Sequence, residues 1–267
     1  MKIDMDEKEI YKRILGMVDL TSLSSTDTYS KIAAMAGKVD CFHDTFPDYP
    51  YPASICVYPT FAKTVSLALS TDEVHVTVVG GCFPASQSTL AVKLAECTGA
   101  VTDGADEVDI VLALNAFLEK NDAEASLEIR EIGAAIRAIK PSVVLKVILE
   151  TGALQEPALI EEASFLAMEA GADFIKTSTG KLSPAATPEA ARIMCACIKD
   201  YHARTGRMVG FKPAGGITTP EEALVYWNIV ADTLGEAWLD KRYFRFGASR
   251  MANNLLSAIE GREVKYF

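Results

Sequence analysis

The chain has 267 residues, of which 49% are hydrophobic and 23% are charged. This length and apolar share suit one barrel-sized folded domain and exclude a largely disordered chain. Acidic residues outnumber basic ones by 36 to 26, and the resulting formal charge of −10 argues against nonspecific binding to nucleic acid or to an anionic membrane.

Short runs rich in Val, Ile and Leu alternate along the chain with longer Ala- and Glu-rich stretches of helical spacing. The short runs are typical of buried parallel strands. Strands are expected at residues 14–20, 54–58, 74–79, 107–112, 143–149, 173–177, 208–212 and 244–247. Helices are expected at residues 26–38, 86–98, 124–139, 157–170, 188–203, 220–234 and 249–259.

Local signals support several of these boundaries. Thr187 and Thr219 each place a hydroxyl at an expected helix N-cap, and each is followed by a proline at the first helical position. Residues 41–52 are rich in Pro, Asp and aromatic residues, and we expect a loop there. No linker or low-complexity stretch divides the chain.

Eight strands that alternate with helices in about 250 residues predict a (β/α)₈ TIM barrel of the α/β class. We expect it to form a single domain over residues 1–267. A doubly wound open sheet is the alternative. The lack of GxGxxG and GxxxxGK[ST] motifs disfavours a nucleotide-binding sheet.

Cysteines and histidines are few and form no metal-binding motif. The six cysteines contain no CxxC pair, and the three histidines no HExxH, so we expect neither disulfides nor a metal site. The N-terminal segment is charged throughout, and no apolar run approaches the roughly 18 residues of a membrane span. We therefore expect a cytoplasmic protein with no membrane or nucleic-acid partner. Barrels of this size occur as monomers and as dimers, so the sequence does not decide whether this chain forms a homodimer.

Five ionisable residues interrupt or end the apolar runs: Asp19, Asp109, Lys146, Lys176 and Lys212. Burying a lone charge is costly, so charges at such positions are usually paired, neutralised or functional. The C-terminal ends of barrel strands line the active site. We therefore expect the five side chains to converge there as catalytic residues.

Structural alternatives apply to two of these residues. Lys146 alone could extend its amine to water or form a structural ion pair. Asp19 alone could cap a turn. Lys176 is different, because a strand-terminal lysine that precedes the hydroxyl- and glycine-rich residues 177–180 would be an unusual way to fill a core.

Lysine has a specific chemistry at such a place. A neutral amine attacks an aldehyde and forms a Schiff base, whereas the ammonium form is not nucleophilic. Burial and a second cation both lower the pKa of a lysine. Lys176 and Lys212 are one strand–helix–strand repeat apart, so we expect them on adjacent strands, with Lys212 activating Lys176.

Three glycine-containing turns are candidate phosphate sites, because backbone amides approach an anion closely at glycine and at helix N-termini. Two of them fall after the seventh and eighth expected strands, where barrels frequently bind phosphate. Taken singly, each could be an ordinary turn. The candidate phosphate-binding residues are Gly180, Lys181, Gly215, Gly216, Ser249 and Arg250.

The phrases GADEVDIV, LKVILETG, GADFIKTSTGK, VGFKPAGGI and RFGAS occur in this order. With VDLTSL and ASICVYP, they resemble deoxyribose-phosphate aldolase over residues 17–250. The resemblance implies a class I aldolase on a (β/α)₈ barrel, with no metal or organic cofactor. It would reversibly cleave 2-deoxy-D-ribose 5-phosphate into acetaldehyde and D-glyceraldehyde 3-phosphate, in deoxyribonucleotide catabolism.

The resemblance also assigns roles. Lys176 in FIKTSTG would form the Schiff base, Lys212 in GFKPAGG would be the second lysine, and Asp109 in EVDIV would relay protons. Lys146 in LKVILET and Asp19 in VDLT would support the same site.

Three features qualify this match. The family often has glycine shortly after the Phe-Pro of the third loop, where this chain has Ala85 and Ser86. The final turn often has two serines, where this chain has Ser249 and Arg250, so the arginine would either strengthen phosphate binding or point to solvent. Tyr266 would assist proton transfer or belong to a frayed tail.

Two other functions stay open at this stage. One is a transaldolase-like Schiff-base enzyme with a ketose donor. The other is a catalytically silent barrel that only senses a sugar phosphate.

Overall fold

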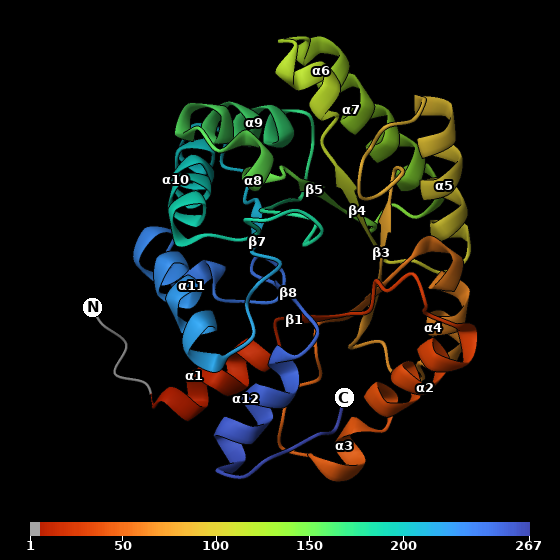
Figure 1. Ribbon diagram of the computed structural model, residues 1–267, viewed down its shortest axis with the longest axis vertical. Helices are drawn as coiled ribbons and strands as arrows, with labels where there is room; N and C mark the ends of the chain where they lie inside the picture. Colours follow the sequence, from red (N-terminus) through yellow and green to blue (C-terminus); the bar gives the residue numbers. More distant parts are fainter. Residues whose placement is uncertain (1–5) are drawn as a thin grey trace.

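Eight parallel strands form the centre of a computed structural model, which describes residues 6–267 (Figure 1). Residues 1–5 of the predicted domain lie outside the described residues. The strands pair in the order β7-β6-β5-β4-β3-β2-β1-β8, and bridges from Phe211 to Phe244 and from Ala214 to Gly247 bring the two edges together. The predicted TIM barrel is therefore confirmed. Its strands are β1 (Val18–Thr21), β2 (Ser54–Val57), β3 (His75–Gly80), β4 (Glu107–Val111), β5 (Val144–Ile148), β6 (Phe174–Lys176), β7 (Gly210–Lys212) and β8 (Phe246–Ala248).

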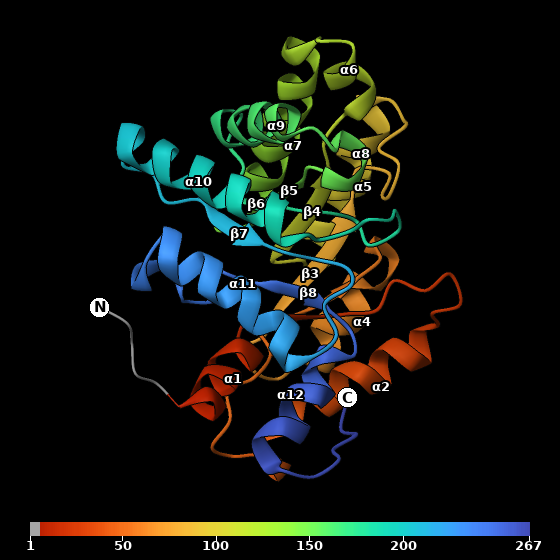
Figure 2. The same ribbon diagram turned by 60° about the vertical axis from the view of Figure 1, so that its left-hand side comes forward.

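Helices surround the strands on the outside of the barrel (Figures 1 and 2). The α-helices are α1 (Glu7–Leu15), α2 (Tyr29–Asp40), α3 (Phe42–Thr45), α4 (Ala62–Ala68), α5 (Leu90–Thr102), α6 (Leu114–Leu118), α7 (Asp122–Ile139), α8 (Thr151–Leu154), α9 (Pro157–Glu169), α10 (Pro188–Thr205), α11 (Pro220–Thr233) and α12 (Met251–Glu260). Short 3₁₀ helices occur at η1 (Pro59–Phe61) and η2 (Glu236–Trp238). Within residues 6–267, no helix has the length and apolarity needed to cross a bilayer.

The predicted caps form at two long helices. The Thr187 hydroxyl accepts a hydrogen bond from the backbone of Ala190 at the start of α10. At α11, Thr219 and Glu222 form a reciprocal capping box. Helix α2 begins three residues later than expected, because Thr28 is its N-cap and accepts from the backbone of Lys31.

Other boundaries also differ from expectation. Ile14 and Leu15 end α1, and β1 begins only at Val18, because a buried helix end and a buried strand have the same short apolar pattern. The expected loop over residues 41–52 contains α3, whose Phe42 is buried among aromatic rings. Helix α5 begins at Leu90 and not at residue 86, because Ser86 adopts a left-handed backbone with φ 56°.

Apolar side chains fill the layer between strands and helices, but the inside of the barrel is charged. Alternation along β4 illustrates the division, since successive strand residues point to opposite faces. Val108 and Ile110 belong to the hydrophobic core, whereas Glu107 and Asp109 contact basic side chains from other strands. The fold thus gathers charges in the barrel interior.

Candidate active site

Asp109 is the centre of a buried cluster at the C-terminal half of the barrel. Its Oδ1 accepts from Lys146 Nζ at 2.9 Å. Its Oδ2 accepts from Lys176 Nζ at 2.8 Å and from Lys212 Nζ at 2.7 Å. Lys212 also contacts Asp19 Oδ2 at 2.5 Å. The structure therefore brings together all five charged residues that the sequence placed at this site.

Strand register explains why these side chains meet. Asp109 on β4 pairs with Lys146 on β5, and Lys176 on β6 pairs with Lys212 on β7. Partners in parallel register sit at the same height and point the same way. The two lysines thus lie on adjacent strands, as their spacing in the sequence predicts.

A second tier of the cluster was missed in the sequence analysis. Arg245 donates to Asp19 at 2.7 Å and to Glu107 at 2.8 Å, and Glu107 also contacts Lys146. Glu107 further accepts from the Thr77 hydroxyl at 2.9 Å. Both missed residues carried a usable signal, since each is a charge in an apolar run. Glu107 also stands two residues before Asp109, on the same face of its strand.

Burial and neighbouring charges set the protonation of the cluster. Burial lowers the pKa of Lys176 most, Lys212 lowers it further, and the attraction of Asp109 only partly opposes them. Burial also disfavours the charged form of Lys212, but the carboxylates of Asp109 and Asp19 outweigh it and raise the pKa of Lys212. For Asp109, burial is outweighed by the three surrounding lysines, which lower its pKa. Of these two neighbouring lysines, Lys176 is therefore the one that loses its proton more readily.

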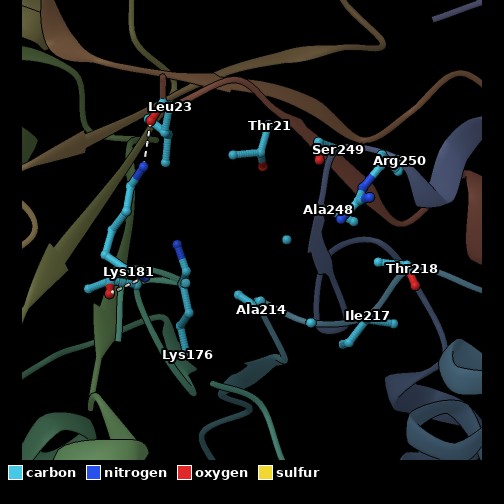
Figure 3. Close-up of a pocket in the computed structure, with 15 residues that line it drawn as sticks. Thr21, Leu23, Lys176, Lys181, Ala214, Ile217, Thr218, Ala248, Ser249 and Arg250 are labelled. Carbon is cyan, nitrogen blue, oxygen red and sulfur yellow. Dashed lines mark hydrogen bonds between the residues drawn. The ribbon is translucent and has the colours of Figure 1, made fainter. Parts of the chain in front are cut away.

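A cavity of about 260 Å³ opens above this cluster, at the C-terminal ends of the strands. Figure 3 shows the Lys176 side chain reaching into the cavity between Lys181 and Ala214, with Ser249 and Arg250 on the far side. The cavity is lined by the loops after β1, β6, β7 and β8, and every predicted phosphate-binding residue lines it: Gly180, Lys181, Gly215, Gly216, Ser249 and Arg250. Of the five charged residues at the centre of the cluster, Lys176 is the one that lines this cavity.

Two glycines are required by the close packing of these loops. Gly215 has φ 84°, and a Cβ there would lie 2.9 Å from the Cα of Gly180. A Cβ on Gly247 would lie 2.8 Å from Ala214 Cβ and 3.3 Å from the Cε of Lys212. Larger residues would therefore displace the cavity wall or the second lysine.

The loop after β6 is held by Glu150, a third residue that the sequence analysis missed. Its carboxylate accepts from the Thr179 backbone at 3.1 Å and from the Thr179 hydroxyl at 2.6 Å. Glu150 is buried and has φ 55°, which is uncommon for a non-glycine residue. On the outer side, Lys181 Nζ donates to the carbonyl of Leu23 at 2.6 Å, which joins this loop to the loop after β1 (Figure 3).

Tyr266 does not line the cavity. Its hydroxyl donates to the carbonyl of Lys38 at 2.8 Å, and its ring packs edge-on against Phe42 and Phe46. In this conformation it supports the outer aromatic cluster. Within residues 6–267, no three His, Cys, Asp or Glu side chains are grouped so that they could hold a metal ion.

Comparison with known proteins defines the class. Residues 14–230 match the family model of the DeoC/LacD family aldolases. A candidate deoxyribose-phosphate aldolase from Coccidioides immitis has a TM-score of 0.73 and 28% identity, covering 91% of this chain and 85% of that one.

Two further structures share the fold. A candidate deoxyribose-phosphate aldolase from Toxoplasma gondii ME49 has a TM-score of 0.81 and 23% identity, covering 96% of each chain. The deoxyribose phosphate aldolase of Aeropyrum pernix, described as a tetramer, has a TM-score of 0.72 and 22% identity, covering 94% of this chain and 91% of that one.

The family match covers most of the chain, and the barrel holds a buried lysine that faces the cavity. The protein is therefore an aldolase, a lyase that breaks carbon–carbon bonds. More specifically, the chain belongs to the DeoC/LacD aldolase family.

Proposed function

We propose that this aldolase works through a Schiff base on Lys176 and reversibly cleaves 2-deoxy-D-ribose 5-phosphate into acetaldehyde and D-glyceraldehyde 3-phosphate. One observation carries the proposal: Lys176 is shared between the buried charge cluster and the cavity, with its amine 2.8 Å from Asp109. The names of the similar structures and the ordered sequence motifs support the substrate. The sequence resemblance further suggests a role in deoxyribonucleotide catabolism in the cytoplasm.

The reaction begins at the aldehyde carbon of the open-chain sugar. The neutral Lys176 amine attacks C1, and loss of water leaves a protonated imine. A base removes the proton of the C3 hydroxyl, the C2–C3 bond breaks, and its electron pair enters the nitrogen-linked enamine. Glyceraldehyde 3-phosphate leaves. Protonation of the enamine at C2, followed by addition of water to the imine, releases acetaldehyde and the free lysine.

Asp109 and Lys212 divide the acid–base work in this scheme. Asp109 is the carboxylate beside the reacting nitrogen, and through a water molecule it would accept and return the protons. Lys212 stays protonated between Asp109 and Asp19, and so disfavours a second positive charge on Lys176 before attack. Lys146 and Asp19 hold these two groups in position.

The phosphate would bind at the far end of the cavity. Ser249 and Arg250 stand at the N-terminus of α12, where the helix dipole favours an anion. The loops containing Gly180 and Gly215 also line the cavity and would contribute backbone amides, and Lys181 would add a charge. Anchoring the phosphate there would place the aldehyde end at Lys176.

Borohydride trapping tests the proposal. The protein is incubated with acetaldehyde and borohydride, and peptides are mapped by mass spectrometry. We expect an ethyl adduct on Lys176 and none on Lys93, a buried lysine of α5 that pairs with Glu128 away from the cavity. Lys176→Ala should abolish both adduct and turnover while the circular dichroism of the barrel is retained.

Two alternative results would contradict it. Trapping at Lys176 by a ketose donor but not by acetaldehyde would indicate a transaldolase-like reaction. Calorimetric binding of deoxyribose 5-phosphate without turnover or adduct would indicate a sensor.

A further inference from the structure

The barrel interior holds an unequal number of acids and bases. The carboxylates are Asp19, Glu107 and Asp109, and the cationic groups are Lys146, Lys176, Lys212 and Arg245. All of them are buried, with at most 3% of each residue exposed. If every group were ionised, the cluster would hold one surplus positive charge in a low-dielectric interior, which is costly.

The contacts show which group can lose that surplus. Lys146 contacts the carboxylates of Glu107 and Asp109, and Lys212 contacts those of Asp109 and Asp19. Arg245 contacts Asp19 and Glu107, and an arginine does not deprotonate in a protein. Lys176 contacts only one carboxylate of the cluster, that of Asp109, which it shares with both other lysines. It is therefore the cation with the least compensation.

We propose that Arg245 is a positioning residue for the reaction, because it supplies the third permanent cation and so leaves Lys176 as the one surplus charge of the barrel interior. The inference rests on the proposed Schiff-base function of Lys176. Arg245 acts from below the site, through Asp19 and Glu107, and does not line the cavity.

The geometry of Arg245 suits a fixed charge. Its two terminal nitrogens donate to Glu107 at 2.8 and 3.2 Å, and one also donates to Asp19 at 2.7 Å. Its Nε donates to the carbonyl of Lys241, and its guanidinium lies 5.9 Å from the ring centre of Phe174. The planar guanidinium thus donates to two carboxylates at once. A lysine ammonium in its place would carry the same charge but would reproduce these hydrogen bonds only in part.

Two other titratable groups face the charged cluster. His75 on β3 lies 2.6 Å from Glu107, and 42% of its side chain is exposed. Cys56 on β2 is buried near Lys212 and Asp109, and burial raises the pKa of its thiol, so it stays neutral. Neither group bridges Asp19 and Glu107 as Arg245 does.

The test measures how borohydride trapping of acetaldehyde on Lys176 depends on pH. In Arg245→Met, three carboxylates face three lysines, so Lys176 would be retained as a cation. We expect the trapping midpoint to move to higher pH and the yield at neutral pH to fall, on the order of tenfold for the loss of one nearby unit charge. Arg245→Lys keeps the charge and should restore most of the yield.

A double variant separates charge from structure. Glu107→Gln combined with Arg245→Met removes one carboxylate and one cation. This restores the single surplus positive charge of the cluster, whereas the hydrogen bonds of Arg245 are still lost. We expect its trapping profile to return toward that of the unaltered protein. Glu107→Gln alone increases the surplus and should move the midpoint to lower pH, so the idea stays testable even if Arg245→Met does not fold.

Three results would overturn the inference. The first is a folded Arg245→Met whose pH profile of trapping is unchanged. The others are a double variant whose midpoint shifts as far as that of Arg245→Met, and a Glu107→Gln variant whose midpoint does not move to lower pH. Thermal unfolding followed by circular dichroism identifies variants that have lost the barrel. If the unaltered protein forms no adduct on Lys176, the proposed function itself fails, and that outcome is distinct from a profile that does not respond to charge.

Discussion

Replacing Lys212 with methionine tests the electrostatic control of the nucleophile directly. Both amines donate to Asp109 Oδ2, Lys176 at 2.8 Å and Lys212 at 2.7 Å. The two nitrogens are therefore at most about 5.5 Å apart, and at an effective dielectric constant of 20 two unit charges at that distance repel by about 3 kcal/mol. That energy corresponds to roughly a hundredfold change in the neutral fraction of Lys176.

We expect Lys212→Met to move the rising limb of the kcat/KM–pH profile to higher pH, because Asp109 would then stabilise the Lys176 cation with Lys146 as the one remaining competitor. The assay follows glyceraldehyde 3-phosphate release from deoxyribose 5-phosphate across pH, with borohydride trapping in parallel. Lys93→Met is the matched control, since it also removes a buried lysine from a carboxylate, that of Glu128. It should lower stability without moving the pH profile.

An unchanged pH profile in folded Lys212→Met would refute the reasoning. A fall in activity that is equal at every pH would also refute it, because it would show that Lys212 contributes to positioning alone.

Three further outcomes are expected. Arg250→Ser should raise KM for deoxyribose 5-phosphate by about tenfold, through loss of a charged hydrogen bond, and leave turnover of unphosphorylated deoxyribose unchanged; an equal effect on both substrates in steady-state assays would place the guanidinium in solvent. Thr219→Ala should lower the free energy of unfolding by about 1 kcal/mol in urea titrations, whereas Thr219→Ser should not, because the serine hydroxyl keeps the cap on α11. The pKa values of Asp109 and Glu107 are lowered in the fold, where nearby cations outweigh the opposing effect of burial. These carboxylates therefore stabilise the protein fully above the pKa of about 4 of unfolded carboxyl groups, and that stabilisation is lost as pH falls below it. Urea midpoints should thus decline below about pH 5, and a protein that is as stable at pH 3 as at pH 6 would contradict the assignment.

Apolar patterning located all eight strands because parallel strands buried on both faces form near-continuous hydrophobic runs. The pattern failed where a helix end is equally buried, at Ile14 and Leu15. It also overlooked α3, a single turn that is buried by aromatic side chains from distant parts of the chain.

The sequence predicted part of the active-site cluster. A charge inside an apolar run is visible without a structure, and that signal found Asp109 and Lys176. The pairing of Arg245 with Asp19 and Glu107 was not readable, because it joins residues 226 and 138 positions apart and depends on how the barrel closes. The position of Glu150 follows likewise from a loop conformation that no local pattern specifies.

Barrel closure itself differs from the rest of the sheet. Strands β7 and β8 are joined by isolated bridges at Phe211–Phe244 and Ala214–Gly247, whereas every other neighbouring pair forms a continuous ladder. The loops that follow these two strands both line the cavity. An anion held by both loops would therefore connect the two edges of the sheet. Substrate affinity and the resistance of the β7–β8 junction to opening are then thermodynamically linked, and each increases the other.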